Sequence, residues 1–171
     1  MKRFSPKLFV LGLVLGALAA VFVAGAYGRA ASPNRRGALV ALRKTNLGTV
    51  LVDARGRTLY LFEKDRKGMS ACGGSCAKFW PPLVSRGTPR AGKGVHRSML
   101  GLTKRTDGRR QVTYAGHPLY AFIGDKAAGQ TTGEGLSNFG AKWYALAASG
   151  RAVKSSGSSS GGSGYGSGGG W

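Results

Sequence analysis

The feature that most constrains the fold of this chain is an internal repeat at a spacing of 60 residues. Without a gap, residues 40–65 superpose on residues 100–125, and both copies contain Leu-Tyr-x-Phe-x-x-Asp. The similarity resumes at a spacing of 64, where CAKFWPPL from Cys76 faces GAKWYALA from Gly140. Two copies are fewer than a solenoid needs. The repeat therefore predicts two halves of one core, with units at about 40–83 and 100–147.

Each unit has the pattern of short β-strands separated by turns. In the first unit, β-rich runs at Val40–Lys44, Thr49–Val52 and Thr58–Phe62 flank turn residues, and Gly56 supplies the positive φ of the second turn. The same glycine recurs as Gly116 in the second unit. We therefore predict a mainly β fold, with a single domain over residues 38–150 that consists of two pseudo-equivalent strand–turn–strand repeats.

The strand that carries the shared motif has apolar residues on both faces. Alternation along the strand puts Tyr60 and Phe62 on one face and Leu59 and Leu61 on the other. This pattern is typical of a central strand that is covered on both sides. The helical signal is short, about one turn near residues 76–80 that ends before two prolines.

The repeated tyrosine and aspartate allow two interpretations. A hydroxyl and a carboxylate that occur twice predict two ligand sites. Alternatively, the aromatic rings fill the core and the aspartates bond turn amides after the strand. We favour the second interpretation, because one local structural cause explains both copies. The motif residues are Tyr60, Phe62, Asp65, Tyr120, Phe122 and Asp125.

These segments closely resemble a bacterial family known as the secreted repeat of unknown function, also described as predicted lipoproteins with a Tyr-x-(Phe/Trp/Tyr)-x-x-Asp motif. The resemblance covers about residues 45–150 and includes both motif copies. It implies an exported envelope protein with paired repeats. A lipoprotein needs a cysteine directly after its signal core, whereas the cysteines of this chain are Cys72 and Cys76. Lipid anchoring is therefore not expected.

The two cysteines form the one site-like constellation. We favour a disulfide between Cys72 and Cys76, because exported proteins keep disulfides and the two intervening glycines can bend the chain. Gly140 stands where the second unit would have Cys76. The alternative is a copper or thiol redox site, in which the cysteine pair acts with a histidine and the Met69 thioether. The candidate histidines are His117 and His96.

The chain is strongly basic, with 26 Lys and Arg against 6 Asp and Glu and a formal charge of +20. Such a charge predicts adhesion to anionic envelope polymers or lipid head groups. No nucleic-acid motif accompanies it, so no specific nucleic acid is expected. We interpret the densest basic series as a solvated surface rather than a specific anion site. That series is Arg86, Arg90, Lys93, Arg97, Lys104, Arg105, Arg109 and Arg110.

The two ends of the chain differ from the middle. Basic residues precede an apolar run at residues 8–26, which predicts a helical signal peptide or N-terminal membrane anchor within residues 1–30. Its removal would leave 22 basic against 6 acidic residues, a formal charge of +16. Residues 151–171 are rich in Gly and Ser and predict a disordered tail, which ends at Trp171.

No motif predicts catalysis: the chain has no Gly-x-Ser-x-Gly elbow, no His-Glu-x-x-His and no phosphate loop. We therefore expect an exported, strongly basic cell-envelope protein that is a non-enzymatic binding or structural module without a cofactor. The alternative is a copper-binding or thiol redox protein. Membrane contact through residues 8–26 is a further expectation.

Overall fold

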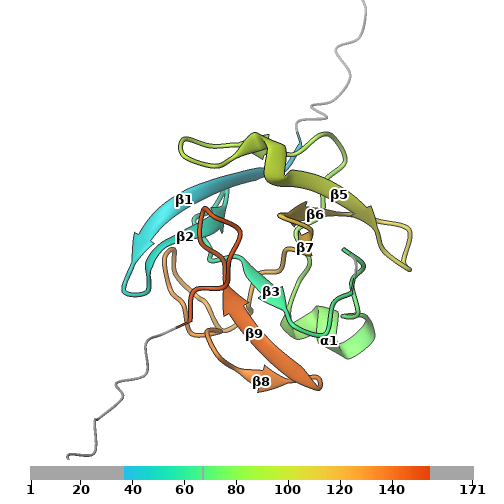
Figure 1. Ribbon diagram of the computed structural model, residues 1–171. Coiled ribbons are helices and arrows are strands. Elements are labelled where there is room, and N and C mark those ends of the chain that lie inside the picture. Colours follow the sequence, from blue (N-terminus) through green and yellow to red (C-terminus); the bar gives the residue numbers. More distant parts are fainter. Residues whose placement is uncertain (1–36, 67, 155–171) are drawn as a thin grey trace, which may run out of the picture. The chain divides into compact units, whose positions relative to one another are not determined.

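The computed structural model describes residues 37–66 and 68–154. These residues form a mainly β structure, which confirms the predicted fold class (Figure 1). The predicted N-terminal helix lies outside the described residues. The elements are β1 (Leu39–Thr45), β2 (Gly48–Asp53), β3 (Tyr60–Phe62), α1 (Gly74–Phe79), β4 (Arg90–Ala91), η1 (Arg97–Met99), β5 (Leu100–Lys104), β6 (Arg110–Tyr114), β7 (His117–Pro118), β8 (Ser137–Asn138) and β9 (Ala141–Ala145).

The strands form three small sheets, and two of them begin with equivalent hairpins. In the first repeat β1 pairs antiparallel with β2, and β4 adds to β1 in parallel. In the second repeat β5 pairs antiparallel with β6, which continues into β7. The third sheet has the strand order β3-β9-β8 and joins the two repeats, because β3 belongs to the first and β9 to the second.

The motif strand of each repeat pairs with the final segment of the other repeat. Phe62 in β3 lies opposite Trp143 in β9. In the second repeat, Leu83 N–H donates to Leu119 C=O at 2.8 Å, and Ile123 N–H donates to Phe79 C=O at 3.0 Å. The pairing is therefore crosswise in both directions, and neither repeat completes its own sheet.

The centre of the molecule lies where the two motif strands meet. Tyr60 N–H donates to Tyr120 C=O at 2.8 Å, and Tyr120 N–H donates to Tyr60 C=O at 3.0 Å. These reciprocal bonds mark an approximate twofold axis between the repeats. The two halves therefore share one core, as the internal repeat predicts.

The gapless superposition of the repeats is wrong by one residue in the second strand. Between β1 and β2 the turn has two residues, with Thr45 opposite Gly48. The corresponding turn in the second repeat has three, because Arg105 N–H donates to Arg109 C=O. The next turn is one residue longer in the first repeat than in the second, so the overall spacing between the repeats stays at 60. Because one residue of slip exchanges the two faces of a strand, Val52 and Val112 belong to different core clusters.

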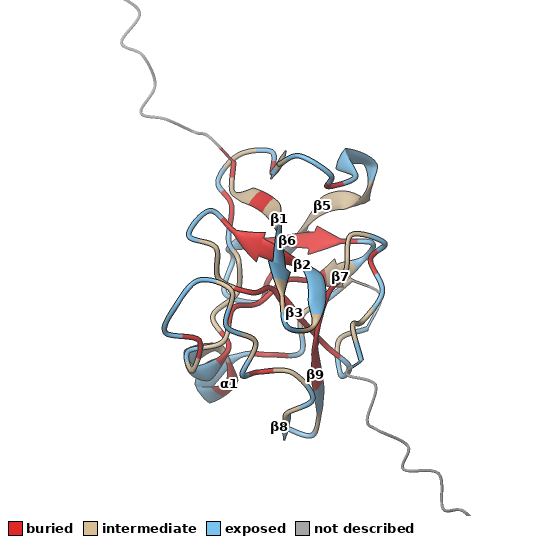
Figure 2. Ribbon diagram, turned by 90° about the vertical axis from the view of Figure 1, so that its left-hand side faces the viewer, coloured by how far each residue is buried: buried red, intermediate tan, exposed pale blue. Residues whose placement is uncertain are grey.

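The core has two apolar layers, one on each face of the motif strands. Leu59 and Leu61 belong to one cluster, and Tyr60 and Phe62 belong to the other. All four side chains are 6% exposed or less. This confirms the face assignment that the sequence predicts. Figure 2 shows that burial is concentrated in the strands at the centre of the molecule.

The short helix α1 runs from Gly74 to Phe79, slightly earlier than the turn that the sequence predicts. Its C-cap is Trp80, whose N–H donates to Cys76 C=O, and Pro81 follows directly. In the described part of the chain, no helix is long and apolar enough to cross a membrane.

The first residues of the predicted tail belong to the described structure. Ala147 N–H donates to Arg151 C=O at 2.9 Å, and Val153 N–H donates to Ala145 C=O at 2.7 Å. Hydrogen bonding to β9 therefore extends the sheet structure past the expected boundary at 150. Residues 155–171 lie outside the described residues.

Candidate functional site

The tyrosine of each motif bonds the aspartate of the other motif. The Tyr60 hydroxyl donates to Asp125 Oδ2 at 2.7 Å, and the Tyr120 hydroxyl donates to Asp65 Oδ2 at 2.9 Å. The central pairing of the two motif strands sets this geometry, because it aligns each tyrosine with the end of the opposite strand. These crosswise bonds cannot be predicted from the sequence, because no residue near either tyrosine indicates which of the two aspartates accepts its hydroxyl.

Each aspartate also fixes the backbone of the loop that follows it. Asp65 Oδ1 accepts the N–H of Ala71 at 2.7 Å. Asp125 Oδ1 accepts the N–H of Thr132 at 2.9 Å and its hydroxyl at 2.7 Å. Each carboxylate therefore ties the tyrosine of one repeat to a loop of the other.

Burial changes the acidity of these groups. Burial raises the pKa of Asp65 to about 6, against the opposing effect of the Ala71 N–H and the Tyr120 hydroxyl. Burial, reinforced by the facing carboxylates, raises the pKa of Tyr60 and of Tyr120 well above the ordinary tyrosine value. Both hydroxyls therefore stay protonated at neutral pH and act as donors.

Four aromatic rings stack between the two motif strands. Trp80 and Trp143 are parallel, with ring centroids 3.9 Å apart. Phe62 stacks on Trp143 at 4.0 Å, and Phe122 stacks on Trp80 at 4.4 Å. Trp80 is therefore the structural equivalent of Trp143, a spacing of 63. The spacing of 64 that the sequence suggests is wrong by one residue, so Gly140 is not the counterpart of Cys76.

Cys72 and Cys76 form a disulfide, with their Cα atoms 5.2 Å apart. This confirms the predicted pairing. Both cysteines are buried, at 1% and 6% exposure, in the same cluster as Trp80. The bridge therefore closes the loop before α1 and lies against the aromatic stack.

A buried arginine connects this loop to the second repeat. The guanidinium of Arg105 donates to Cys72 C=O at 2.7 Å, to Ser70 Oγ at 2.7 Å and to Gln111 Oε1 at 2.6 Å. Arg105 is only 5% exposed, so the interpretation of the whole basic series as solvated is wrong for this residue. The sequence gives no local signal for it, because Arg105 lies in a run of exposed basic residues. Its role is to hold the disulfide loop in place.

The residues of the copper alternative have other surroundings in the structure. The two cysteine sulfurs are bonded to each other. Met69 is 59% exposed, and His117 is half-buried in β7, where burial lowers its pKa. Within residues 37–66 and 68–154, no group of three or more His, Cys, Asp and Glu side chains is placed to hold a metal ion. Copper binding through Cys72 and Cys76 would require reduction of the bridge first.

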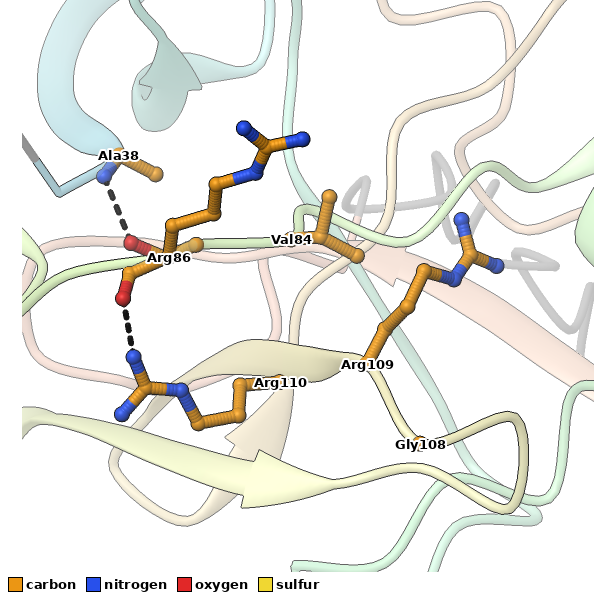
Figure 3. A pocket seen from close by; sticks show the side chains of 7 residues that line it. Ala38, Val84, Arg86, Gly108, Arg109 and Arg110 are labelled. Carbon is orange, nitrogen blue, oxygen red and sulfur yellow. Dashed lines mark hydrogen bonds between the residues drawn. The ribbon is translucent and has the colours of Figure 1, made fainter. Parts of the chain in front are cut away.

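The candidate functional site is an open hollow of about 610 Å³ that is lined by three arginines, Arg86, Arg109 and Arg110 (Figure 3). Arg86 comes from the segment between α1 and β4, Arg109 comes from the turn before β6, and Arg110 is the first residue of β6. These elements are bonded together, because Ser85 N–H donates to Arg110 C=O at 2.9 Å. The start of β1 closes one side, where Ala38 N–H donates to Ser85 Oγ.

The three arginines differ in how strongly they are held. Arg110 donates to the carbonyl oxygen of Arg86, and Arg109 donates to Asp107 Oδ2 at 2.8 Å. The hydrogen bonds from Arg109 hold the pKa of Asp107 far below its usual range, so this carboxylate is charged and occupied. In Figure 3 the guanidinium of Arg86 projects beside the hollow. Three arginine residues thus line the hollow, with their guanidinium groups pointing in different directions in Figure 3, and the Asp107 carboxylate lies beside Arg109.

Comparison with known proteins places the chain in a family. Residues 41–84 and 101–147 match the family described as secreted repeat of unknown function, so the chain belongs to that family. The two matched segments coincide with the two repeats of the fold, and the description supports export. None of the curated proteins and none of the solved structures compared with the chain matches it.

Proposed function

We propose that this protein is an exported, non-enzymatic module that binds anionic envelope polymers through the hollow lined by Arg86, Arg109 and Arg110. The observation that carries the proposal is the gathering of three arginines from two separate segments around one open space. A guanidinium group presents a planar set of donors that matches a carboxylate or a phosphate. Anionic polymers offer many such groups in series.

The backbone makes this arrangement a preformed one. Val84 bridges to Gln111 in β6, and the Ser85 hydroxyl donates to Gly87 C=O at 2.7 Å. The segment that carries Arg86 is therefore tied to the strand that carries Arg110. A rigid scaffold reduces the ordering that binding requires, which favours affinity.

The groups best suited to acid–base chemistry are used by the fold itself, which supports a non-enzymatic role. The Tyr60 and Tyr120 hydroxyls donate to carboxylates, and Asp125 accepts three hydrogen bonds. These contacts hold the two repeats together. These hydroxyl and carboxylate groups are therefore already engaged in structural hydrogen bonds.

Binding of fluorescent polygalacturonate, a carboxylated polysaccharide, tests the proposal. The variant Arg86→Gln/Arg109→Gln/Arg110→Gln is expected to weaken binding at least about tenfold at moderate salt, because it removes all three guanidinium groups from the lining of the hollow. Binding of the native protein should fall steeply with ionic strength and be nearly lost at about 1 M salt, where screening is almost complete.

A variant with the same change in net charge is the matched control. Lys93, Arg97 and Lys126 are exposed and lie outside the hollow. Their simultaneous replacement by glutamine should weaken binding only about two- to threefold, through the general field. If both triple variants lose the same affinity, the diffuse charge is responsible and the assignment of the hollow is wrong.

A further inference from the structure

Three large apolar side chains lie exposed and close together, away from the arginine hollow. Phe79 is 49% exposed, Ile123 is 41% exposed and Phe139 is 37% exposed. The rings of Phe79 and Phe139 have centroids 5.9 Å apart, and Ile123 N–H donates to Phe79 C=O. We call these three residues the aromatic tip. They come from the end of α1, the segment after the second motif strand and the β8–β9 turn.

The conformation of Phe139 is unfavourable for its residue type. It lies at the tip of the β8–β9 turn with a φ of 56°, and Gly140 follows with a φ of 88°. Glycine, asparagine and aspartate adopt this region more easily than a bulky side chain does. A phenylalanine at this position keeps an apolar ring at the surface against local preference. A backbone outlier of this kind is often associated with a functional requirement.

Lysines surround the aromatic tip. Lys64 Nζ lies 3.4 Å from Phe139 C=O, and exposed Lys78 directly precedes Phe79. Exposed Lys142 lies in β9, on the strand that leaves the turn. One acidic residue, Glu63, adjoins Lys64 in the chain, and its N–H donates to Lys142 C=O. The ion pairs of the described part of the chain involve other residues, at Asp53 and Asp107. The rim therefore keeps a net positive charge.

We propose that the aromatic tip and its lysine rim dock on an anionic lipid bilayer. The apolar side chains would enter the boundary between head groups and acyl chains, while Lys64, Lys78 and Lys142 contact lipid phosphates. A polar polymer would complement the lysines but not the rings, whereas an anionic bilayer complements both. Contact is interfacial and needs no spanning helix.

The position of the tip suits this role. Figures 1 and 2 both place α1 and β8 at one end of the molecule, with β1 and β5 at the other end. The arginine hollow adjoins the start of β1. Lipid docking at one end would therefore leave the hollow open to a polymer, and the two proposals stand independently.

Sedimentation with phosphatidylglycerol vesicles, using the exported protein, tests the proposal. The variant Phe79→Ser/Ile123→Ser/Phe139→Asn should lower the partition coefficient at least about tenfold relative to the native protein. A control at Met69, which is 59% exposed and belongs to neither the tip nor the hollow, is Met69→Ser, and it should change the partition coefficient less than about twofold. Unchanged partitioning of the triple variant would overturn the proposal. If this variant still binds polygalacturonate, its loss of lipid binding is independent of the proposed function.

A fluorescent label identifies the docking face even where other parts of the chain also bind lipid. The described residues hold no free cysteine, so Ile123→Cys and Ser98→Cys, the latter at an exposed position outside the tip and the hollow, each provide one attachment point for a polarity-sensitive dye. Anionic vesicles should shift the emission of the dye at 123 to shorter wavelength and leave the dye at 98 unchanged. Neutral phosphatidylcholine vesicles should produce little shift. Equal shifts at both positions, or a shift at 123 caused by polygalacturonate alone, would contradict lipid docking at the tip.

Discussion

The two copies of the tyrosine–aspartate pair occupy equivalent places in the fold but differ in their surroundings. Asp125 is 5% exposed and accepts three hydrogen bonds, from the Tyr60 hydroxyl and from the N–H and hydroxyl of Thr132. Asp65 is only partly buried and accepts two, from the Tyr120 hydroxyl and one backbone N–H. Its pKa is raised to about 6. The tyrosine–aspartate hydrogen bond is therefore present in both repeats, but its surroundings differ.

The aspartate with fewer hydrogen bonds is in the repeat that carries the disulfide. The loop that supplies the backbone N–H to Asp65 contains Ser70, whose hydroxyl oxygen lies 2.8 Å from the Tyr120 hydroxyl oxygen, and Cys72 follows in the chain. The bridge and Arg105 fix this loop. The corresponding loop in the second repeat is held by the more extensive bonding of Asp125. A covalent link thus accompanies the pair whose aspartate accepts fewer hydrogen bonds.

The largest expected effect is at the more buried pair. Asp125→Ala should lower the free energy of unfolding by about 3 kcal/mol, because it leaves the buried Tyr60 hydroxyl without its acceptor. Asp65→Ala should lower it by about 1 kcal/mol, since it also removes a poorly solvated charge. Urea denaturation at neutral pH measures both. Equal losses would contradict the unequal roles of the two aspartates.

Removal of the disulfide should have the next largest effect. Cys72→Ser/Cys76→Ser should lower the free energy of unfolding by about 2 kcal/mol, the value for a loop of about five residues, and leave a folded β protein. Circular dichroism and urea denaturation measure the fold and the loss. Complete unfolding at room temperature would show that the bridge holds more than its local loop.

The shared turn glycines differ between the repeats in the space around them. At Gly116, with a φ of 82°, no atom lies within 4 Å of the point that a Cβ would occupy, so Gly116→Ala should cost about 1 kcal/mol through backbone strain alone. At Gly56, with a φ of 78°, a Cβ would lie 3.0 Å from the Cβ of Ala128. Gly56→Ala should therefore cost about 2 kcal/mol. Thermal denaturation of both variants measures the two losses. A larger loss for Gly116→Ala than for Gly56→Ala would contradict the prediction.

The smallest expected effect is a pH dependence at Asp65. Its folded pKa of about 6 lies above its ordinary value of 3.8, so the protonated form favours the folded state. The contribution is complete below about pH 4 and is lost as the pH rises through about 6. It amounts to about 1 kcal/mol after allowance for screening by water. Asp65→Asn should remove it from the stability profile between pH 4 and 7. An identical profile for the variant would contradict the raised pKa.

Much of the local structure follows from the sequence, because it depends on short-range pattern. Alternation assigns Leu59 and Tyr60 to opposite layers, and the positive φ of Gly116 follows from its place in a turn. The crosswise pairing does not follow. Whether β3 pairs within its own repeat or with Trp143 in the other depends on contacts that are distant in the chain.

Other features of the structure cannot be predicted from the sequence, because residues of the same type have different surroundings in the fold. The one-residue slip at Val112 arises from two turns whose lengths compensate, which leaves the sequence spacing unchanged. In the basic series, Arg105 is buried whereas Arg86 lines the hollow. Only the three-dimensional neighbours of these arginines distinguish a structural guanidinium from one that faces an open site.

The central claim is that each motif tyrosine serves the aspartate of the other repeat. Double-mutant cycles of unfolding free energy, with Tyr→Phe and Asp→Ala changes that each remove the hydrogen bond, test it most directly. We predict coupling of about 1 kcal/mol or more for Tyr60 with Asp125 and for Tyr120 with Asp65, the two pairs that share a hydrogen bond. Coupling should be near zero for Tyr60 with Asp65 and for Tyr120 with Asp125. Coupling within each motif instead of between them would contradict the account.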